Sequence, residues 1–328
     1  MKRKFIVTWW AWFIWSVIVK YLNEKWIEDI IIVDNLDNTE KWKNLVWKRY
    51  INYFDRTEFL EKVINWEILE KDDIVIHMWA CSSTTETDSN YIMENNSKYT
   101  KKLFDECQKV WARLIYASSA ATYWNWNQWY SDNNFELYPL NMYWYSKHLL
   151  DQWLLRETDD FKTVKSQVVW FKFFNVYGPN EYHKWSMASM VFHWFNQIKQ
   201  DWKIWLFKSY RDDFEDGMQS RDFIYVKDIA KVIWFMVEHP EINWIFNLWT
   251  WESRTFYDLA KATFMALWLE PKIHFKDMPE ILKNKYQYYT KAEMWKLKNI
   301  WYNERFYSLE EWVKDYVTNF LDKWIKTY

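Results

Sequence analysis

Residues 5–34 read FIVTWWAWFIWSVIVKYLNEKWIEDIIIVD, with two short apolar runs on either side of a longer amphipathic segment. The runs Phe5–Thr8 and Asp29–Asp34 have the length and the β-branched content of buried strands. The segment between them is long enough for a helix. A strand, a helix and a second strand in this order predict two parallel strands joined by a helical crossover.

The same alternation continues through the first half of the chain. Further strands are predicted at Asp73–His77, Arg113–Ala117 and Gln167–Phe173, with helices at Asn90–Lys109 and Asn141–Arg156. Strands that alternate with helices are typical of an α/β fold with one parallel sheet covered by helices on both faces.

Beyond about residue 175 the alternation gives way to polar loops such as Lys208–Ser220. The short runs Ile224–Val226 and Ile245–Leu248 could return strands to the main sheet. We therefore predict a main domain, residues 1–174 plus about 222–250, and a smaller α/β substrate-binding domain, about 175–221 plus 251–328.

Composition excludes several classes of protein. The 328 residues carry 43 Lys and Arg against 45 Asp and Glu, a net charge of −2, which disfavours a strongly basic nucleic-acid binder. At 50% hydrophobic and 27% charged residues, the chain is not expected to be disordered. Cys81, Cys107 and six scattered histidines form no disulfide framework and no metal-ligand pattern, so we expect a cytoplasmic protein without a metal site.

The first 19 residues also resemble a secretory signal peptide, because MKRK precedes the 15-residue apolar run FIVTWWAWFIWSVIV. That run is shorter than the roughly 20 residues of a membrane span. No small-residue cleavage site follows it, and the next residues lead into the second strand. The strand-and-helix interpretation therefore explains more, and we expect no membrane association.

Tryptophan stands where glycine would be expected. The chain has 2 glycines and 29 tryptophans, whereas average usage would give roughly 23 glycines. With glycine for tryptophan, Thr8–Trp15 becomes TGGAGFIG, which contains the spacing G-x-x-G-x-x-G after the first strand. Glycines in such a turn allow a tight strand-to-helix connection and a close approach of the backbone to a pyrophosphate, which then lies at the helix N-terminus.

Six further stretches point the same way. They are HMWACSSTTE from His77, YASSAATYW from Tyr116, NMYWYSK ending at Lys147, FNVYGPNEYHKWSMAS from Phe174, RDFIYVKDI from Arg221 and NLWTW from Asn247. With glycine for tryptophan, they resemble motifs of the extended short-chain dehydrogenase/reductase family nearly end to end. ACSSTTE and HKWSMAS are similar to its nucleotide-sugar epimerases that act on a heptose in lipopolysaccharide inner-core synthesis. The resemblance implies a Rossmann-type doubly wound sheet and a homo-oligomer, commonly a pentamer.

The resemblance also implies a reaction: oxidation at C6 of a nucleotide-linked heptose and return of the hydride to the opposite face, without net consumption of the cofactor. Tyr143 and Lys147 lie four residues apart and share a helix face, where the ammonium would lower the tyrosine pKa. Ser119 matches the serine that orients the substrate hydroxyl, although Ser118 is an adjacent alternative. Lys184 would be the second proton-transfer group.

The cofactor expected from the resemblance is NADP, with NAD possible. Asp34 ends the second strand, where an acidic residue usually binds the ribose 2′-hydroxyl and favours NAD. Lys41 and Arg56, however, match positively charged positions that would bind a 2′-phosphate. The other implied cofactor contacts are Phe13, Ile14, Asn35, Met78, Trp79, Ala80, Cys81, Ser82, Asn95, Lys147, Val176 and Lys184.

The resemblance further implies a set of contacts to a small nucleotide-sugar substrate. Arg221 is the best supported on physical grounds, because a guanidinium pairs well with a diphosphate. The complete set is Asn175, Ser186, His193, Phe207, Lys208, Ser209, Tyr210, Arg221 and Tyr286.

Ten tryptophans occupy motif positions where the family has glycine: Trp9, Trp10, Trp12, Trp15, Trp79, Trp124, Trp144, Trp185, Trp249 and Trp251. At about 1–3 kcal/mol of overpacking per site, their cost reaches roughly 10–30 kcal/mol, more than the stability of about 5–15 kcal/mol that native domains have. We therefore expect that the chain as written neither binds the dinucleotide nor keeps the family fold.

Three alternatives to an active epimerase of this kind remain open. The chain could be an inactive variant that keeps the architecture without catalysis, or another nucleotide-sugar epimerase or reductase of the same fold. It could also be an aromatic-rich binding module, whose exposed tryptophans would then cluster on one surface. In the sequence, the tryptophans instead fall at turn positions throughout the chain.

Overall fold

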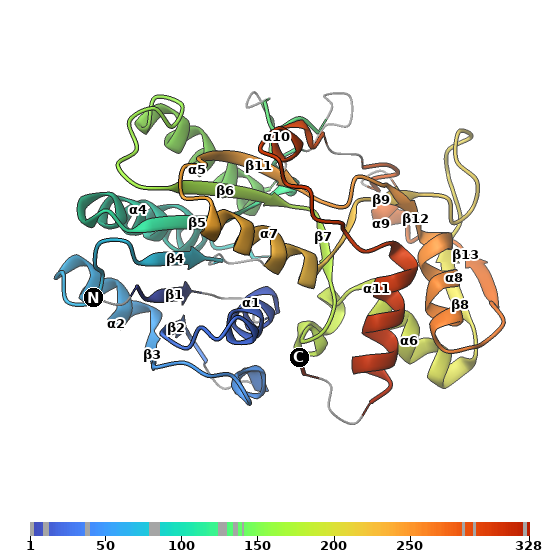
Figure 1. Cartoon of the computed structure of the whole chain (residues 1–328). Coiled ribbons are helices and arrows are strands. Elements are labelled where there is room, and N and C mark those ends of the chain that lie inside the picture. The colour runs from blue at the N-terminus through green and yellow to red at the C-terminus, as the bar shows by residue number, and fades with distance from the viewer. Residues whose placement is uncertain are drawn as a thin grey trace.

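The computed structural model describes residues 3–8, 13–36, 40–78, 86–123, 130–133, 137–139, 141–283, 286–290, 293–323 and 327–328. Its largest feature is a seven-stranded sheet in the order β11-β6-β5-β4-β1-β2-β3, and every neighbouring pair in it is parallel (Figure 1). The strands are β1 (Phe5–Thr8), β2 (Ile30–Asp34), β3 (Asn52–Asp55), β4 (Ile74–His77), β5 (Arg113–Ser119), β6 (Val168–Phe173) and β11 (Trp244–Leu248). The predicted doubly wound parallel sheet is confirmed.

Helices cover both faces of this sheet, as Figure 1 shows. α1 (Ile14–Glu24) and α7 (Val226–Glu238) pack on one face, and α2 (Arg56–Ile64), α4 (Tyr99–Val110) and α5 (Met142–Glu157) pack on the other. Alternate strand residues face opposite ways: Val7 lies in the core under α1 and α7, and its neighbour Ile6 lies in the core under α2, α4 and α5.

The order of the strands creates a natural binding position. The chain runs from β1 out to β2 and β3 and then crosses back to β4, so the direction of winding reverses between β1 and β4. In open α/β sheets, ligands bind at the carboxyl ends of the strands beside such a reversal. The carboxyl ends of β1, β4 and β5 lie side by side at that edge.

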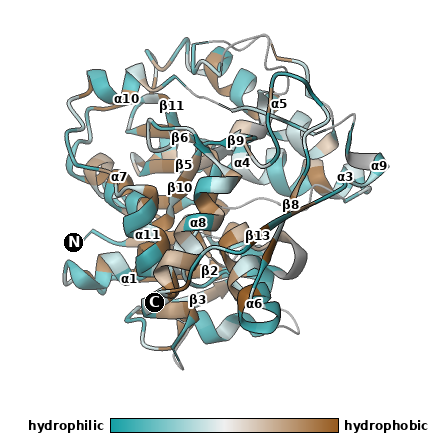
Figure 2. Cartoon of the chain, turned by 90° about the vertical axis from the view of Figure 1, so that its right-hand side faces the viewer, coloured by the Kyte–Doolittle hydropathy of each residue, from teal (hydrophilic) through white to brown (hydrophobic). Residues whose placement is uncertain are grey.

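A smaller part of the chain packs around a core of its own. It contains three two-stranded sheets, which pair β7 (Asn175–Tyr177) with β10 (Phe223–Tyr225), β9 (Ser220–Arg221) with β12 (Arg254–Thr255), and β8 (Ile204–Phe207) with β13 (Ile273–Lys276). α6 (Met190–Asp201), α8 (Phe256–Ala266) and α11 (Leu309–Tyr316) pack against them, and Figure 2 looks onto this part. The shorter elements are η1 (Glu40–Leu45), α3 (Ser89–Met93), η2 (Glu94–Lys98), η3 (Ala120–Thr122), η4 (Tyr182–Met187), α9 (Glu280–Lys283), α10 (Trp295–Asn299) and η5 (Val317–Leu321).

Most predicted elements lie where the sequence placed them, with two differences. Residues 90–109 form α3, the π-helical turn η2 and α4 in place of one continuous helix. The prediction that Ile224–Val226 returns to the main sheet is wrong, because β10 pairs with β7 outside it. Three buried apolar residues indicate a strand, but their pattern carries no information about which sheet they join.

Two of the ten motif tryptophans lie inside the core of the described fold. Trp15 lies in the first turns of α1 and Trp249 follows β11, and both indole rings are buried in the core under α1 and α7. Neither indole N–H has a hydrogen-bond partner among the described residues, so each leaves a buried donor unpaired.

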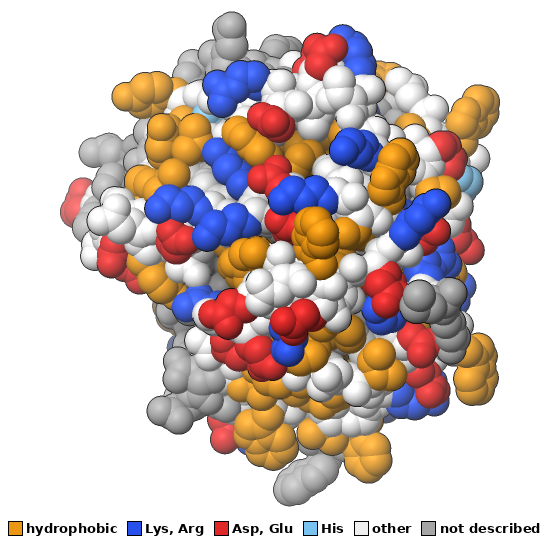
Figure 3. Space-filling view, turned by 90° about the vertical axis from the view of Figure 1, so that its left-hand side faces the viewer, with side chains coloured by type: hydrophobic (Ala, Val, Ile, Leu, Met, Phe, Trp, Pro, Cys, Tyr) orange, Lys and Arg blue, Asp and Glu red, His pale blue; other side chains and the backbone are white. Residues whose placement is uncertain are grey.

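Charges of both signs are mixed on one face of the molecule. In Figure 3, basic and acidic side chains intermingle over the face that carries the N-terminal end of the described chain. Within the described residues, no helix combines the length and apolar character needed to cross a bilayer.

Candidate active site

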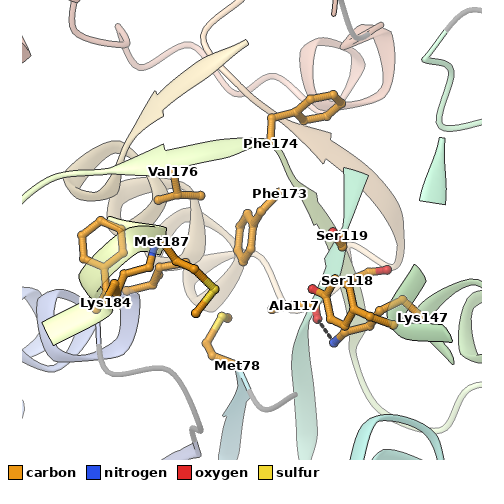
Figure 4. A pocket seen from close by; sticks show the side chains of 13 residues that line it. Met78, Ala117, Ser118, Ser119, Lys147, Phe173, Phe174, Val176, Lys184 and Met187 are labelled. Carbon is orange, nitrogen blue, oxygen red and sulfur yellow. Dashed lines mark hydrogen bonds between the residues drawn. The ribbon is translucent and has the colours of Figure 1, made fainter. Parts of the chain in front are cut away.

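A cavity of about 290 Å³ opens at the carboxyl edge of the central sheet (Figure 4). Its walls come from the ends of β5 and β6, the start of α1 and α5, β7 and the turn η4. These segments carry most of the residues that the sequence assigned to catalysis. The lining residues are Phe13, Ile14, Met78, Ala117, Ser118, Ser119, Tyr143, Lys147, Phe173, Phe174, Val176, Lys184 and Met187.

The two serines at the end of β5 have different environments. Ser118 Oγ donates to Asp151 Oδ1 at 2.8 Å, and the Asp151 carboxylate forms an ion pair with Lys172 Nζ at 3.2 Å. Both charged side chains are fully buried, so each depends on the other for compensation. The Ser118 proton is thus committed to this pair, whereas Ser119, the residue predicted for catalysis, lines the same cavity.

Tyr143 and Lys147 project from the first two turns of α5. The helix begins at Asn141, whose side chain accepts a hydrogen bond from the Trp144 amide at 2.9 Å. Lys147 is only 2% exposed, and its ammonium donates to the Ala117 carbonyl at 2.9 Å. The spacing of four residues places Tyr143 on the same face of α5, and both side chains line the cavity.

Lys184 lies across the cavity from Ser119 and Lys147, and Figure 4 shows it beside Met187 on the opposite wall. Its ammonium lies 5.0 Å from the centre of the Phe13 ring. The segment that contains Lys184 is held at its two ends by a contact between Glu181 and Ser189. The buried Glu181 carboxylate accepts hydrogen bonds from the Ser189 amide at 2.8 Å and from the Ser189 hydroxyl. Burial lowers the pKa of Lys184, and the Glu181 carboxylate opposes that shift.

Residues at the end of β2 fit a dinucleotide ribose. Asp34 is buried; its Oδ1 accepts from the Asn35 amide at 2.6 Å, and its Oδ2 has no hydrogen-bond partner among the described residues. Lys41 donates to the Asn35 carbonyl at 2.8 Å, and Arg56 donates to Asn95 Oδ1 at 2.5 Å. Asp34, Asn35 and Lys41 therefore lie together. Arg56 and Asn95, which were each predicted to contact the cofactor, are hydrogen-bonded to each other.

A second cavity, of about 340 Å³, lies next to the first and shares Val176, Lys184 and Met187 with it. Asn175 from β7 and Phe256 from α8 also line it. The buried guanidinium of Arg221 lies 5.5 Å from the Phe256 ring and 5.4 Å from the Tyr286 ring. Of these three residues only Phe256 lines the second cavity; Arg221 and Tyr286, which were predicted to bind the substrate, line neither cavity, and Arg221 lies behind the Phe256 ring.

Comparison with known proteins identifies this combination of fold and site. The family model described as the NAD dependent epimerase/dehydratase family matches residues 11–248, more than two thirds of the chain. The chain belongs to that family.

Two curated members of the family are similar over nearly their whole length. The ADP-L-glycero-D-manno-heptose-6-epimerase of Nitratidesulfovibrio vulgaris strain Hildenborough is 46% identical over 320 residues, which cover 97% of this chain and 98% of that protein. The enzyme of the same name from Fusobacterium nucleatum is 44% identical over 329 residues, with the same coverage.

Solved structures of the family share the architecture. The Helicobacter pylori ADP-L-glycero-D-manno-heptose-6-epimerase superposes with a TM-score of 0.79 at 23% identity, covering 97% of this chain and 96% of that one. A UDP-N-acetylglucosamine 4-epimerase from Methanobrevibacter ruminantium gives 0.78 at 24% identity, covering 97% and 98%. At these identities the likeness concerns the fold alone.

Several predicted site residues stand apart from the two cavities. His193 on α6 lines neither of them. Lys208 forms an ion pair with Asp277 at 3.2 Å, and Tyr210 donates to the same carboxylate at 3.0 Å. Ser209 is held by its amide, which donates to Asp216 Oδ1 at 2.6 Å. Phe207 approaches the cluster around Arg221 through an edge contact with the Tyr286 ring. Residues 79–82 and the side chain of Ser186 lie outside the described part of the structure.

Sequence reasoning missed the buried groups that hold the site together. Asp151, Lys172 and Glu181 form buried bonds within the segments that carry the predicted catalytic residues, and the sequence analysis singled out none of the three. Glu181 lies inside a motif that was quoted, but only its burial reveals its contacts. Asp151 lies four residues after Lys147 on α5, and its partner Lys172 comes from β6.

Proposed function

We propose that the active site of this chain, when the turn after β1 carries glycine, catalyses epimerisation at C6 of ADP-D-glycero-D-manno-heptose to ADP-L-glycero-D-manno-heptose, a precursor of the lipopolysaccharide inner core. The identity of 44–46% to epimerases of that name over nearly their full length supports the substrate. The observation that carries the mechanism is the placement of Tyr143 and Lys184, two groups able to transfer a proton, in the lining of one cavity.

Each side chain in the cavity has a role in this proposal. Ser119 orients the C6 hydroxyl, and Tyr143 accepts its proton in the tyrosinate form, which the Lys147 ammonium stabilises. After the C6 ketone has rotated in the cavity, Lys184 on the opposite wall donates a proton to its oxygen; solvent then removes the proton gained by Tyr143 and replaces the one lost by Lys184. A bound nicotinamide dinucleotide would supply the chemistry of hydride acceptance and return at C6. Arg221 would pair with the substrate diphosphate.

NADP is the proposed form of the dinucleotide. Burial raises the pKa of Asp34 to about 8, against the opposing effect of the Lys41 ammonium. Asp34 is therefore mostly protonated at neutral pH and can donate a hydrogen bond to a phosphate oxygen instead of repelling it. Lys41, whose charge acts on Asp34, and Arg56, which follows the neighbouring strand β3, supply positive charge that suits a 2′-phosphate.

The proposed activity requires glycine in the turn after β1. Trp9, Trp10, Trp12 and Trp15 stand at the glycine positions of the pyrophosphate-binding turn, where a side chain would occupy the space of the pyrophosphate or crowd the helix against the sheet. We therefore expect the chain as written to be inactive and a variant with these four residues replaced by glycine, the loop-glycine variant, to be active.

The test is epimerisation of purified ADP-D-glycero-D-manno-heptose by the chain as written and by the loop-glycine variant, followed by chromatographic separation of the two epimers. In the active background, Tyr143→Phe and Lys184→Ala are each expected to lower kcat about 100-fold or more. Tyr145→Phe is the matched control, because Tyr145 is exposed on the same helix and lines neither cavity. No epimerisation by the loop-glycine variant, or an unchanged rate in Tyr143→Phe, would overturn the proposal.

A further inference from the structure

Lys147 is held by a tyrosine from the strand beside it. Its ammonium donates to the hydroxyl of Tyr116 on β5 as well as to the Ala117 carbonyl. The nitrogen lies 4.4 Å from the centre of the Tyr116 ring. Tyr116 is fully buried and packs against Trp170 on one side and His77 on the other. Tyr116 does not line the cavity, and the hydrogen bond from Lys147 links it directly to a residue that does.

A buried hydrogen-bonded chain of Thr100, His77 and Thr8 lies next to Tyr116. Burial raises the pKa of the Tyr116 hydroxyl, and the side chain of Thr100 on α4 opposes that shift. Thr100 Oγ1 also lies 2.9 Å from His77 Nε2, and His77 Nδ1 lies 2.5 Å from Thr8 Oγ1. All these side chains are buried, and the chain ends at the last residue of β1, immediately before the dinucleotide-binding turn.

The directions of these bonds can be assigned because Thr100 donates its own proton to the Asn96 carbonyl at 3.1 Å. Thr100 Oγ1 must then accept from His77, so His77 carries its proton on Nε2 and accepts from Thr8 on Nδ1. The single Thr100 proton goes to a backbone carbonyl and cannot be passed to Tyr116. The arrangement is an anchor and not a proton relay.

We propose that Tyr116 is a positioning residue that holds Lys147 beneath Tyr143. Because an ammonium group can only donate, the Tyr116 oxygen accepts from Lys147. Two ammonium protons are thereby fixed, to Tyr116 and to Ala117, beside a cavity that Lys147 and Tyr143 both line. The proposal rests on the function proposed above, in which Lys147 stabilises the Tyr143 tyrosinate.

The test compares Tyr116→Phe with Tyr99→Phe in the loop-glycine variant. Tyr99 is the matched control: it stacks near His77, with ring centres 5.7 Å apart, and its hydroxyl bonds to the Arg56 carbonyl at 3.2 Å instead of to Lys147. Each change removes one buried hydroxyl and keeps the ring. We expect Tyr116→Phe to lower kcat about 10-fold with the substrate KM unchanged within twofold, and Tyr99→Phe to change kcat less than twofold.

A crystal structure of Tyr116→Phe provides a readout that does not depend on activity. We expect the Lys147 ammonium to leave the Ala117 carbonyl and turn to another acceptor. If the loop-glycine variant does not epimerise the substrate, the proposed function fails, and the crystal structure alone decides the role of Tyr116. Equal kcat values for the two variants, or a Lys147 that stays in place without the hydroxyl, would overturn the proposal.

Discussion

Tryptophans inside the regular elements differ sharply from those at the ends of helices. Trp170 on β6, Trp194 on α6 and Trp312 on α11 are at most 2% exposed and lie in the hydrophobic cores. The second group, here named the helix-end tryptophans, has φ between 57° and 67° and side chains that are 51–84% exposed. Its members are Trp26, Trp47, Trp66, Trp111, Trp202, Trp268 and Trp301.

Hydrogen bonds show why the backbone is left-handed at these positions. After α1, the Trp26 amide donates to the Asn23 carbonyl at 3.1 Å, and the Ile27 amide donates to the Leu22 carbonyl at 3.0 Å. This pair of bonds is the Schellman motif, which satisfies the last carbonyls of a helix and usually has glycine at the left-handed residue. The same two bonds close α2 at Trp66 and α8 at Trp268.

At the helix ends, the left-handed backbone favours glycine but the residue is tryptophan. In the buried group, the large apolar side chain suits its place in the core. The helix-end tryptophans occupy positions where glycine is favoured, and their exposed side chains contribute little packing. None of the seven is among the ten motif positions. Tryptophan at a position that favours glycine is therefore not confined to the binding motifs. Trp251, with φ 73°, is a motif position that shows the same strain.

The largest effect is expected when all seven helix-end tryptophans are replaced by glycine. A left-handed conformation costs an L-residue roughly 1–2 kcal/mol, and distant sites add nearly independently. The free energy of unfolding should therefore rise by roughly 7 kcal/mol or more, measured by urea denaturation. An unchanged midpoint would show that these residues do not strain the backbone.

The opposite sign is expected in the buried group. Trp312 packs 3.9 Å from Tyr177, measured between ring centres, and its indole N–H donates to the Tyr307 carbonyl at 2.7 Å. Trp312→Ala should lower the free energy of unfolding by about 3–5 kcal/mol, because it leaves a cavity in the core. The same denaturation experiment measures it. A stabilised Trp312→Ala would mean that the two groups do not differ.

Replacing Trp9, Trp10, Trp12 and Trp15 with glycine should restore dinucleotide binding. We expect NADP to bind about 100-fold more tightly than to the chain as written, which corresponds to about 2.7 kcal/mol. Calorimetric titration of both proteins measures the difference. Ordinary NADP affinity in the unchanged chain would contradict the expectation.

A single helix end separates strain from exposure. Trp26→Gly should stabilise the protein by roughly 1–2 kcal/mol. Trp26→Ala should gain much less, because it removes the exposed indole but keeps the Cβ atom that disfavours a positive φ. Thermal unfolding of the two variants under identical conditions makes the comparison. Equal gains would assign the effect to the indole and not to the backbone.

The parts of the molecule that could be predicted are those whose signal is local. The strands β1 and β2 and the helix between them follow from apolar spacing, and Tyr143 and Lys147 follow from a four-residue spacing on a helix. The edge strand β3 was not predicted, because its residues NYFD are half-exposed and short. Asp151, Lys172 and Tyr116 were missed as supports of the site because their roles arise only when β5, β6 and α5 pack together.

The exposure of the helix-end tryptophans has a spectroscopic consequence. Indoles in water fluoresce at longer wavelength than indoles in an apolar interior, and seven of them here are already more than half in water in the folded state. Their emission would form a background that changes little on unfolding. Circular dichroism of the parallel sheet would report the unfolding transition more faithfully than intrinsic fluorescence.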